Sequence, residues 1–271
     1  MPSLALDGCD LYYEAHGSGP ALVFAHGLGG NHLTWWQQVP HFQGRYRCVT
    51  FAHRGFGLSR AAPGGPGPAA FVDDLAALID HLGLGDVRLV AQSMGGWTSV
   101  GYAVREPRRV RALVLASTVG PVTHPDIDLA WRAWAEGLAS GAGAVAVARG
   151  IHPACGERLA REQPALDFLY RGLDALSVGL DKDAVRGQLL SMRTMPAEAA
   201  ASLRMPVLCI TGEEDVVIPP AAVEALASLI PGARLARVPE AGHSVYWERP
   251  AVFNRLVDGF LAEAAASAPV R

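Results

Sequence analysis

The chain has 271 residues, of which 50% are apolar and 18% are charged, and its formal net charge at pH 7 is −3. This composition excludes an intrinsically disordered chain and predicts one α/β domain with a large core and an insertion. The arginines are scattered rather than clustered, so we expect neither nucleic acid nor an anionic membrane as a partner.

The amino terminus and the cysteines bear on the cellular compartment. Residues 1–7 show no basic segment followed by an apolar one, which predicts no secretory signal and a cytoplasmic location. The cysteines are far apart and lack metal-binding spacing, so reduced structural thiols and no metal site are expected. They are Cys9, Cys48, Cys155 and Cys209. The small apolar run 142–148 is too short to cross a bilayer, and we expect it to form a helix of the globule.

The first elements end in a glycine-rich loop. Strands are expected at 11–15 and 21–25, joined by a turn at 17–20. The second strand runs directly into His26-Gly27-Leu28-Gly29-Gly30. Backbone N–H groups in such a loop are not obstructed by side chains, and they can stabilise the negative charge that develops on a carbonyl oxygen under nucleophilic attack.

Two helices and a strand are expected before the next strongly apolar strand. A helix is expected at 31–42, a strand at 46–51 and a second helix at 69–82. The strand leads into Ala52-His53-Arg54-Gly55-Phe56-Gly57-Leu58-Ser59. The second helix carries an apolar stripe, and its acids Asp73, Asp74 and Asp80 are expected on the solvated face.

The most informative stretch is the apolar strand that starts at Val87 and the helix that starts near Met94, with Ser93 on the turn between them. Such a tight reversal strains the corner residue and needs small neighbours, which Ala91 and Gly95 supply. The alternative is that Ser93 is only the helix N-cap, since serine is favoured there.

Three segments resemble the α/β-hydrolase superfamily. Ala91-Gln92-Ser93-Met94-Gly95 resembles its nucleophile elbow G-x-S-x-G, with alanine in place of the first glycine. The loop at 26–30 resembles the family's H-G-x-G loop, and 52–59 resembles D-x-R-G-x-G-x-S with Ala52 in place of the acid. The resemblance implies that the backbone N–H groups of Leu28 and Met94 form the oxyanion hole and that His26 braces its loop.

The alternation of strands and helices stops after a strand at 110–116. Helical stretches follow at 129–138, 165–176 and 181–195, and no strand is expected among them. The resemblance implies a helical cap at 119–204 between two parts of the core, 1–118 and 205–271. Trp97, Trp131, Trp134, His124 and His152 are candidates for contact with substrate, although aromatic cap residues can equally pack cap helices together.

The sheet resumes at 206–212 and ends in a segment that resembles the family's G-x-x-D-x-x-x-P, in which Asp215 matches the acid of the catalytic triad. A helix at 221–230 and a strand at 234–238 precede Glu240-Ala241-Gly242-His243-Ser244. The family's last loop carries the triad histidine after a small residue and glycine, so His243 is the expected base.

The chain order Ser93, Asp215, His243 is that of the superfamily, and each residue follows an expected strand. We therefore expect a mostly parallel central sheet with helices on both faces, the α/β-hydrolase fold. The expected protein is a cofactor-free serine hydrolase, monomeric or homodimeric. It would cleave a small, largely apolar carboxylic ester or lactone through an acyl-enzyme on Ser93.

Other activities remain open, because fold-level analogy does not separate them. Within the same triad they are carbon–carbon bond hydrolysis of a meta-cleavage-type product, enol-lactone hydrolysis, and haloperoxidase or perhydrolase activity. A small-molecule receptor that keeps the triad, and a lyase that uses the pocket without an acyl-enzyme, are alternatives of other classes.

Overall fold

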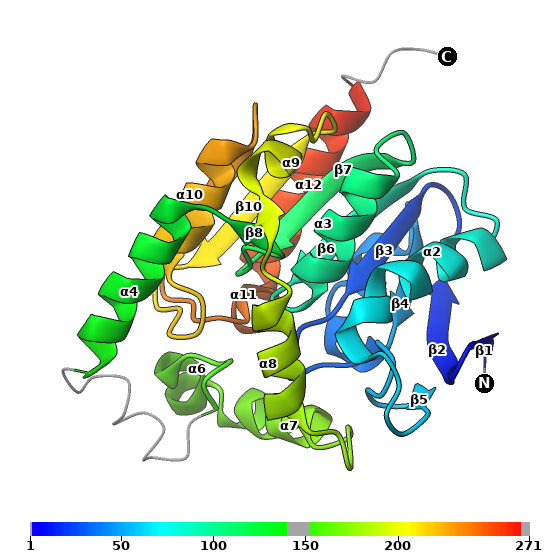
Figure 1. The fold of residues 1–271 in the computed structure, drawn as a ribbon, viewed down its shortest axis with the longest axis horizontal. Coiled ribbons are helices and arrows are strands. Elements are labelled where there is room, and N and C mark those ends of the chain that lie inside the picture. The colour runs from blue at the N-terminus through cyan, green and yellow to red at the C-terminus, as the bar shows by residue number, and fades with distance from the viewer. Residues whose placement is uncertain (1, 140–151, 267–271) are drawn as a thin grey trace.

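The computed structural model describes residues 2–139 and 152–266. The helix predicted at 142–148 lies outside the described residues. Two layers of helices enclose one twisted sheet, and further helices cover one end of it (Figure 1).

The central sheet has the strand order β1-β2-β4-β3-β6-β7-β10-β11, with β5 pairing off β2. Neighbours from β4 to β11 pair in parallel, whereas β2 is antiparallel to β1, β4 and β5. The predicted mostly parallel sheet is therefore confirmed. Its strands are β1 (Ser3–Leu6), β2 (Cys9–His16), β3 (Ala21–Ala25), β4 (Arg47–Phe51), β5 (Arg60–Ala61), β6 (Val87–Gln92), β7 (Val110–Ala116), β10 (Val207–Gly212) and β11 (Arg234–Val238).

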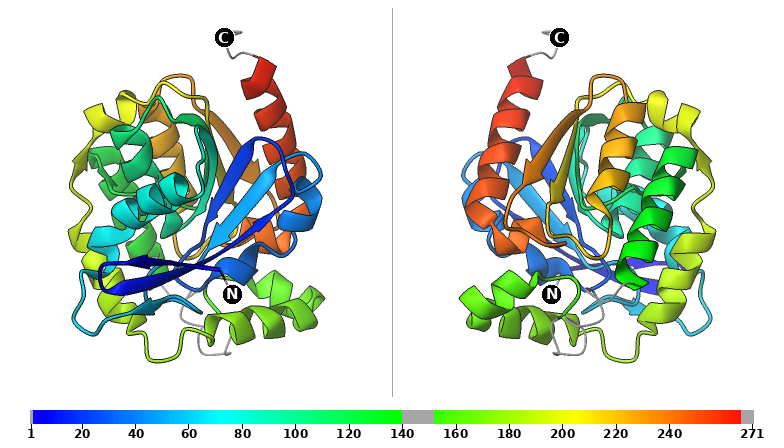
Figure 2. Two further views of the ribbon diagram at one scale, coloured as in Figure 1. Left: turned by 90° about the vertical axis from the view of Figure 1, so that its right-hand side faces the viewer. Right: turned by 90° about the vertical axis from the view of Figure 1, so that its left-hand side faces the viewer.

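Helices cover both faces of the sheet, as Figure 2 shows edge-on. The faces carry α2 (Phe71–His81), α3 (Gly95–Arg105) and α10 (Pro220–Leu229) on one side, and α1 (Val39–Phe42) and α12 (Pro250–Ala266) on the other. Alternate residues of β6 enter different cores: Leu89 packs with α2 and α3, while Val90 packs with α12. Burial on both faces explains why these parallel strands are almost continuously apolar.

The expected helix at 31–42 is two short pieces, η1 (His32–Trp35) and α1. Pro40 lies in the first turn of α1, and a proline has no N–H to continue the hydrogen bonds of a preceding helix. The short 3-10 helix η2 (Gly67–Ala70) precedes α2, and α11 (Val245–Glu248) precedes α12.

The segment predicted as a cap contains α4 (Pro125–Ala139), α6 (Glu157–Glu162), α7 (Pro164–Asp174), α8 (Lys182–Ser191) and α9 (Ala197–Ala201). The expectation of no strand here was wrong, since β8 (Val122–Thr123) and β9 (Met195–Pro196) pair in parallel. The helix predicted at 181–195 ends earlier, at Ser191, and β9 begins at Met195. The helix α4 runs beside α10, whereas α6, α7 and α8 lie together at one end of the sheet (Figure 1).

Within the described ranges, no helix combines the length and apolarity that crossing a membrane requires. All four cysteines are buried and unpaired, in agreement with their predicted structural role.

Candidate active site

Ser93 lies at the sharp turn between β6 and α3, and its backbone has a φ of +49°. Few residues other than glycine adopt this left-handed conformation, which costs on the order of 1 kcal/mol. The turn also needs Gly95, because an added Cβ there would lie 2.2 Å from the carbonyl oxygen of Ala25. The N-cap of α3 is Met94, with no side-chain capping bond, so the N-cap alternative for Ser93 was wrong.

His243 and Asp215 form a buried pair beyond the ends of β10 and β11. The His243 Nδ1 atom lies 2.9 Å from Asp215 Oδ2, and both residues are less than 5% exposed. Asp215 Oδ1 accepts hydrogen bonds from the N–H groups of Val217 and Ile218 at 2.8 and 2.9 Å. The carboxylate is therefore fixed by its own loop while its other oxygen orients the imidazole.

The loops that carry these two residues are held together by their backbones. Glu214 N–H donates to the Ala241 carbonyl at 2.9 Å. Gly212 has no room for a side chain, because a Cβ would lie 2.2 Å from the carbonyl oxygen of Gly242. Gln92, the residue before Ser93, donates to the His243 carbonyl at 3.4 Å. These contacts link the three strand ends that carry Ser93, Asp215 and His243.

Glu248 holds the His243 loop in place through hydrogen bonds to its backbone. Its buried carboxylate accepts from the N–H groups of Gly242, Ser244 and Gly156 at 2.9, 3.1 and 3.1 Å. Burial raises the pKa of this carboxyl, while the three N–H donors oppose that rise. Since Gly156 precedes α6, the same carboxylate ties the His243 loop to the helices at the end of the sheet.

The glycine-rich loop after β3 faces Ser93. Leu28 and Met94 line the same cavity as Ser93, and neither backbone N–H donates to an acceptor in the described part of the chain. His26 Nδ1 lies 2.7 Å from the Gly27 carbonyl oxygen, and its Nε2 accepts the His53 N–H at 2.9 Å. Burial lowers the pKa of His26 to about 3, so this ring is a neutral brace for the loop, as predicted.

The loop at 52–59 is braced without the acid that Ala52 replaces. Ser59 Oγ donates to the Ala52 carbonyl at 2.6 Å and accepts the Tyr12 N–H at 2.8 Å. Arg54 makes two hydrogen bonds, of 2.7 and 2.5 Å, to Asp74 on α2, and both residues are buried. The placement of Asp74 on the solvated face was therefore wrong, because its charge is paired inside the protein.

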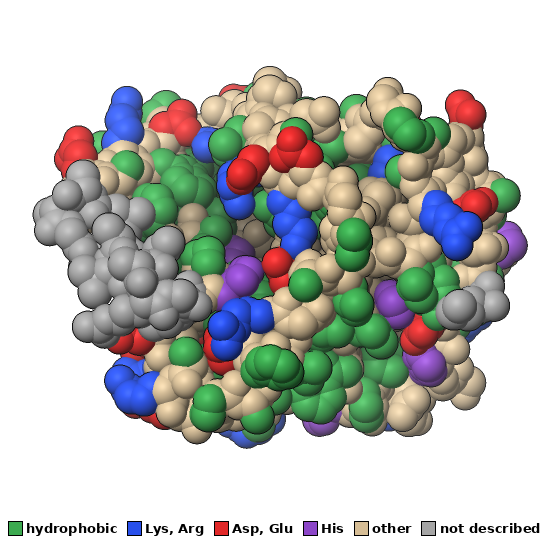
Figure 3. Space-filling model, turned by 90° about the horizontal axis from the view of Figure 1, so that it is seen from below, with side chains coloured by type: hydrophobic (Ala, Val, Ile, Leu, Met, Phe, Trp, Pro, Cys, Tyr) green, Lys and Arg blue, Asp and Glu red, His purple; other side chains and the backbone are tan. Residues whose placement is uncertain are grey.

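A cavity of about 580 Å³ opens between the strand ends and the helices of the predicted cap. Figure 3 views the end of the molecule that carries these helices, where basic and histidine side chains lie around a hollow beside apolar ones. The lining residues are Leu28, Gly29, Gln92, Ser93, Met94, Trp97, Trp131, Trp134, His152, Pro153, Ala154, Tyr170, Asp174, Lys182, Arg186, Leu189, Leu190, Arg193, Val216, Val217, Ile218 and His243.

The residues predicted to contact substrate do not all line the cavity. Trp97, Trp131 and Trp134 line the cavity, and the Trp97 indole N–H donates to the Leu189 carbonyl at 3.1 Å. His124 is not part of the lining; its Nδ1 accepts the Asp126 N–H at 3.3 Å at the start of α4. This local capping contact holds the His124 ring on its own helix.

The cavity also has a charged wall, of which only His152 was expected from the sequence. At the end of α7, Asp174 forms an ion pair with Lys182, whose Nζ lies 2.7 Å from Asp174 Oδ1. His152 Nε2 lies 3.7 Å from Asp174 Oδ2. Burial would raise the pKa of Asp174, but these two partners outweigh it and lower the pKa. Arg186 and Arg193 complete this wall. The helical spacing of the basic residues in 182–193 was the available signal.

Within the described ranges, no group of three or more His, Cys, Asp and Glu side chains is arranged to hold a metal ion.

Residues 20–156 and 159–250 match the alpha/beta hydrolase fold family. "Putative non-heme bromoperoxidase BpoC" of Mycobacterium tuberculosis is 30% identical over 95% of this chain and 99% of its own. The 3-oxoadipate enol-lactonase 2 of Acinetobacter baylyi is 29% identical over 89% of this chain and 88% of its own. A thermophilic esterase from Thermogutta terrifontis, solved with malate bound, is 27% identical with a TM-score of 0.76, over 94% of each chain. The chain therefore belongs to the α/β-hydrolase fold family.

Proposed function

We propose that the protein is a serine hydrolase that cleaves a carboxylic ester or lactone through an acyl-enzyme on Ser93. The main support is that Ser93, in its strained conformation, lines a cavity together with His243. The Nδ1 atom of His243 is hydrogen-bonded to the buried Asp215, which leaves Nε2 for the serine. A serine hydroxyl is a weak nucleophile at neutral pH and needs a positioned base, and the base in turn needs an orienting partner.

The reaction has two halves. Ser93 Oγ attacks the carbonyl carbon while His243 Nε2 takes the hydroxyl proton, and Asp215 stabilises the imidazolium that forms. The tetrahedral oxyanion collapses, the C–O bond to the alcohol breaks, and His243 returns the proton to the leaving alkoxide. Water then attacks acyl-Ser93 with His243 as base, which releases the acid and restores the serine.

The two backbone N–H groups of Leu28 and Met94 are the proposed oxyanion hole. Both are unpaired within the described residues and both residues line the cavity beside Ser93. Donors that are already fixed by the fold need no reorganisation when charge develops on the substrate oxygen. The bracing of the loop by His26 and of the turn by Gly95 serves this fixed geometry.

The relatives support an ester or lactone as substrate, since an esterase and an enol-lactonase are among them. The 30% identity to a protein named as a bromoperoxidase favours perhydrolysis as a second candidate. In that reaction hydrogen peroxide replaces water in the second half and acyl-Ser93 is released as a peracid. The first half, and its dependence on Ser93, is common to both.

The test measures turnover of p-nitrophenyl esters of increasing acyl length by wild type, Ser93→Ala and Ser228→Ala, with and without hydrogen peroxide. We expect Ser93→Ala to lower kcat by at least about a thousandfold. Ser228, whose Oγ donates within α10, is the matched control and should leave kcat unchanged. Retained turnover in Ser93→Ala would contradict the proposal, and peracid formation would favour the second candidate.

A further inference from the structure

We propose that the substrate carries a carboxylate, separated from its scissile bond by an apolar spacer, and that Arg186 binds this carboxylate. The inference rests on the proposed function, because it names the substrate class of the same cavity. The proposed substrate is therefore not largely apolar, as expected from the sequence, but has an apolar middle and an anionic end.

One face of α8, continued by the residues that follow it, lines the cavity. Its lining residues are Lys182, Arg186, Leu189, Leu190 and Arg193. Their successive intervals of four, three, one and three are those of a single helix face, so basic and apolar side chains share one wall. Among the described residues, the lining thus carries three cationic side chains, and its one carboxylate is that of Asp174.

Two of the three cations are already committed to the fold. Lys182 Nζ lies 2.7 Å from Asp174 Oδ1 and donates to the Asp174 carbonyl at the same distance, which joins α8 to α7. Arg193 pairs with Asp128 at 2.5 Å and donates to the carbonyl of Val122 in β8. A substrate anion would have to compete with these contacts, and both side chains are mostly buried.

Arg186 is held much less firmly. Its ion-pair partner within the described residues is Asp183, one helical turn earlier, and the side chains of the two are 58% and 87% exposed. Such exposed pairs contribute little because water screens them and their side chains remain mobile. The guanidinium has five N–H donors in a planar fork that matches a carboxylate, so Arg186 can bind a substrate carboxylate without loss of a structural contact.

A second observation also points to an acceptor in the cavity. Trp131 lines it, and the buried indole N–H of Trp131 has no acceptor among the described residues. An unpaired buried donor is costly unless a ligand or water accepts from it. Trp131 also packs edge-on against Trp134, with ring centroids 5.7 Å apart, and these rings with Leu189 and Leu190 supply the apolar surface for the spacer.

The experiment compares matched acyl chains that differ in one charge. Mono-p-nitrophenyl glutarate and adipate are hydrolysed beside their neutral methyl esters by wild type, Arg186→Gln and Arg186→Lys. We expect wild type to prefer the acids by at least about tenfold in kcat/KM, as a charge-assisted bidentate contact implies. Arg186→Gln should remove this preference mainly through KM, and Arg186→Lys should restore part of it.

The matched control is Arg161→Gln, an exposed arginine of α6 outside the cavity lining. It should keep the wild-type ratio of acid to neutral ester. A wild-type ratio near one, or a ratio that is unchanged in Arg186→Gln, would overturn the inference. The ratio is measured within each variant, so a general loss of folded protein does not imitate the expected result.

A binding measurement separates this inference from the proposed function. Calorimetry with glutarate monomethyl ester on Ser93→Ala needs no turnover, and we expect binding that weakens about tenfold when Arg186→Gln is added. If esters were not turned over at all but this binding persisted, the hydrolase proposal would fall and the anion site would stand. Absence of binding, or binding independent of Arg186, would overturn the anion site.

Discussion

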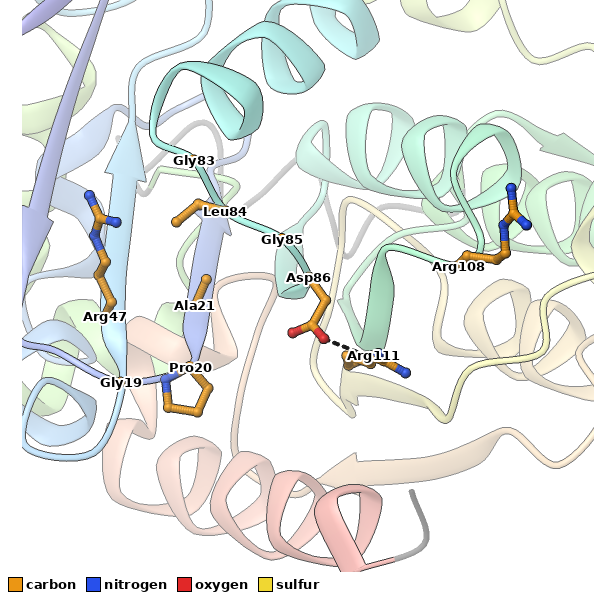
Figure 4. Close-up of a pocket in the computed structure, with 10 residues that line it drawn as sticks. All are labelled: Gly19, Pro20, Ala21, Arg47, Gly83, Leu84, Gly85, Asp86, Arg108 and Arg111. Carbon is orange, nitrogen blue, oxygen red and sulfur yellow. Dashed lines mark hydrogen bonds and ion pairs between the residues drawn. The ribbon is translucent and has the colours of Figure 1, made fainter. Parts of the chain in front are cut away.

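Two hollows of similar size lie at opposite ends of the central sheet. The one at the carboxyl ends of the strands measures about 580 Å³ and holds Ser93 and His243. The other, at the amino ends, measures about 540 Å³ and is drawn in Figure 4. Its lining residues are Gly19, Pro20, Ala21, Arg47, Gly83, Leu84, Gly85, Asp86, Arg108 and Arg111.

The two hollows have similar volumes but differ in the arrangement of their polar side chains. In Figure 4, Arg47 and Arg108 lie on opposite sides of the hollow, and Arg111 turns to Asp86. These side chains are exposed or partly exposed and do not converge on one point. At the carboxyl end, by contrast, His243 lines the cavity beside Ser93, and its buried ring is hydrogen-bonded to the buried Asp215 behind it. Convergent buried polar groups, rather than cavity volume, mark the candidate site.

The largest contrast is expected from the same carboxylate-to-amide change at each end. Asp215→Asn should lower kcat by about 10⁴-fold, because an amide facing His243 Nδ1 favours the wrong tautomer of the ring. Asp86→Asn, at the amino end, should leave kcat unchanged. Steady-state kinetics on one p-nitrophenyl ester measures both. Equal kcat values for the two variants would remove the functional difference between the ends.

Glycine substitutions should separate the ends by stability. Gly95→Ala places a Cβ 2.2 Å from a backbone oxygen, so we expect a loss of at least about 3 kcal/mol or failure to fold. Gly85→Ala meets nothing within 4 Å and should change stability by at most about 1 kcal/mol, in the stabilising direction. Urea unfolding measures both. A mild effect of Gly95→Ala would show that the elbow can relax.

The ion pairs offer a similar contrast. Asp74→Asn breaks the buried pair with Arg54 and should cost about 3–5 kcal/mol, because it leaves an uncompensated buried guanidinium. The pair of Asp86 with Arg111 is partly exposed, so Asp86→Asn should cost at most about 1 kcal/mol. Denaturant midpoints with unchanged slopes would report both values. Similar costs for the two variants would contradict the role that burial has in this comparison.

The smallest expected effect is the pH dependence due to Glu248. Burial raises its folded pKa above the ordinary 4.5, so the stability that this carboxyl contributes is full below 4.5 and decreases as pH rises towards the folded pKa. Glu248→Gln should remove this component and cost about 1–3 kcal/mol for its disturbed N–H contacts. The difference in unfolding free energy between wild type and variant should therefore shrink from pH 4 to pH 7. A constant difference would contradict a raised pKa.

The sequence predicted the elements that carry local signals. The apolar strands, the turn at Ser93 and the loops of Asp215 and His243 could be recognised because each motif is contiguous and follows a strand. The pairing of β8 with β9 could not, because each is two residues long and their contact is non-local. The burial of Asp74 depended on Arg54, 20 residues earlier in the chain.

The substrate cavity was only partly predictable for the same reason. Tryptophans at 97, 131 and 134 could be proposed as lining because large aromatic side chains favour pockets. Which face of α8 turns to the cavity depends on how it packs against the rest of the molecule, so Arg186 and Lys182 were missed. His124 was assigned to the cavity by its place in the chain, whereas a contact within its own helix holds it elsewhere.

Covalent labelling tests most directly whether Ser93 is an activated nucleophile. Wild type, Ser93→Ala and His243→Ala would be incubated with a fluorophosphonate, followed by intact mass and peptide mapping. We predict one adduct per chain, located on Ser93, absent from Ser93→Ala and formed far more slowly in His243→Ala. A folded wild-type protein that is not labelled, or an adduct on another residue, would contradict the claim that Ser93 is an activated nucleophile.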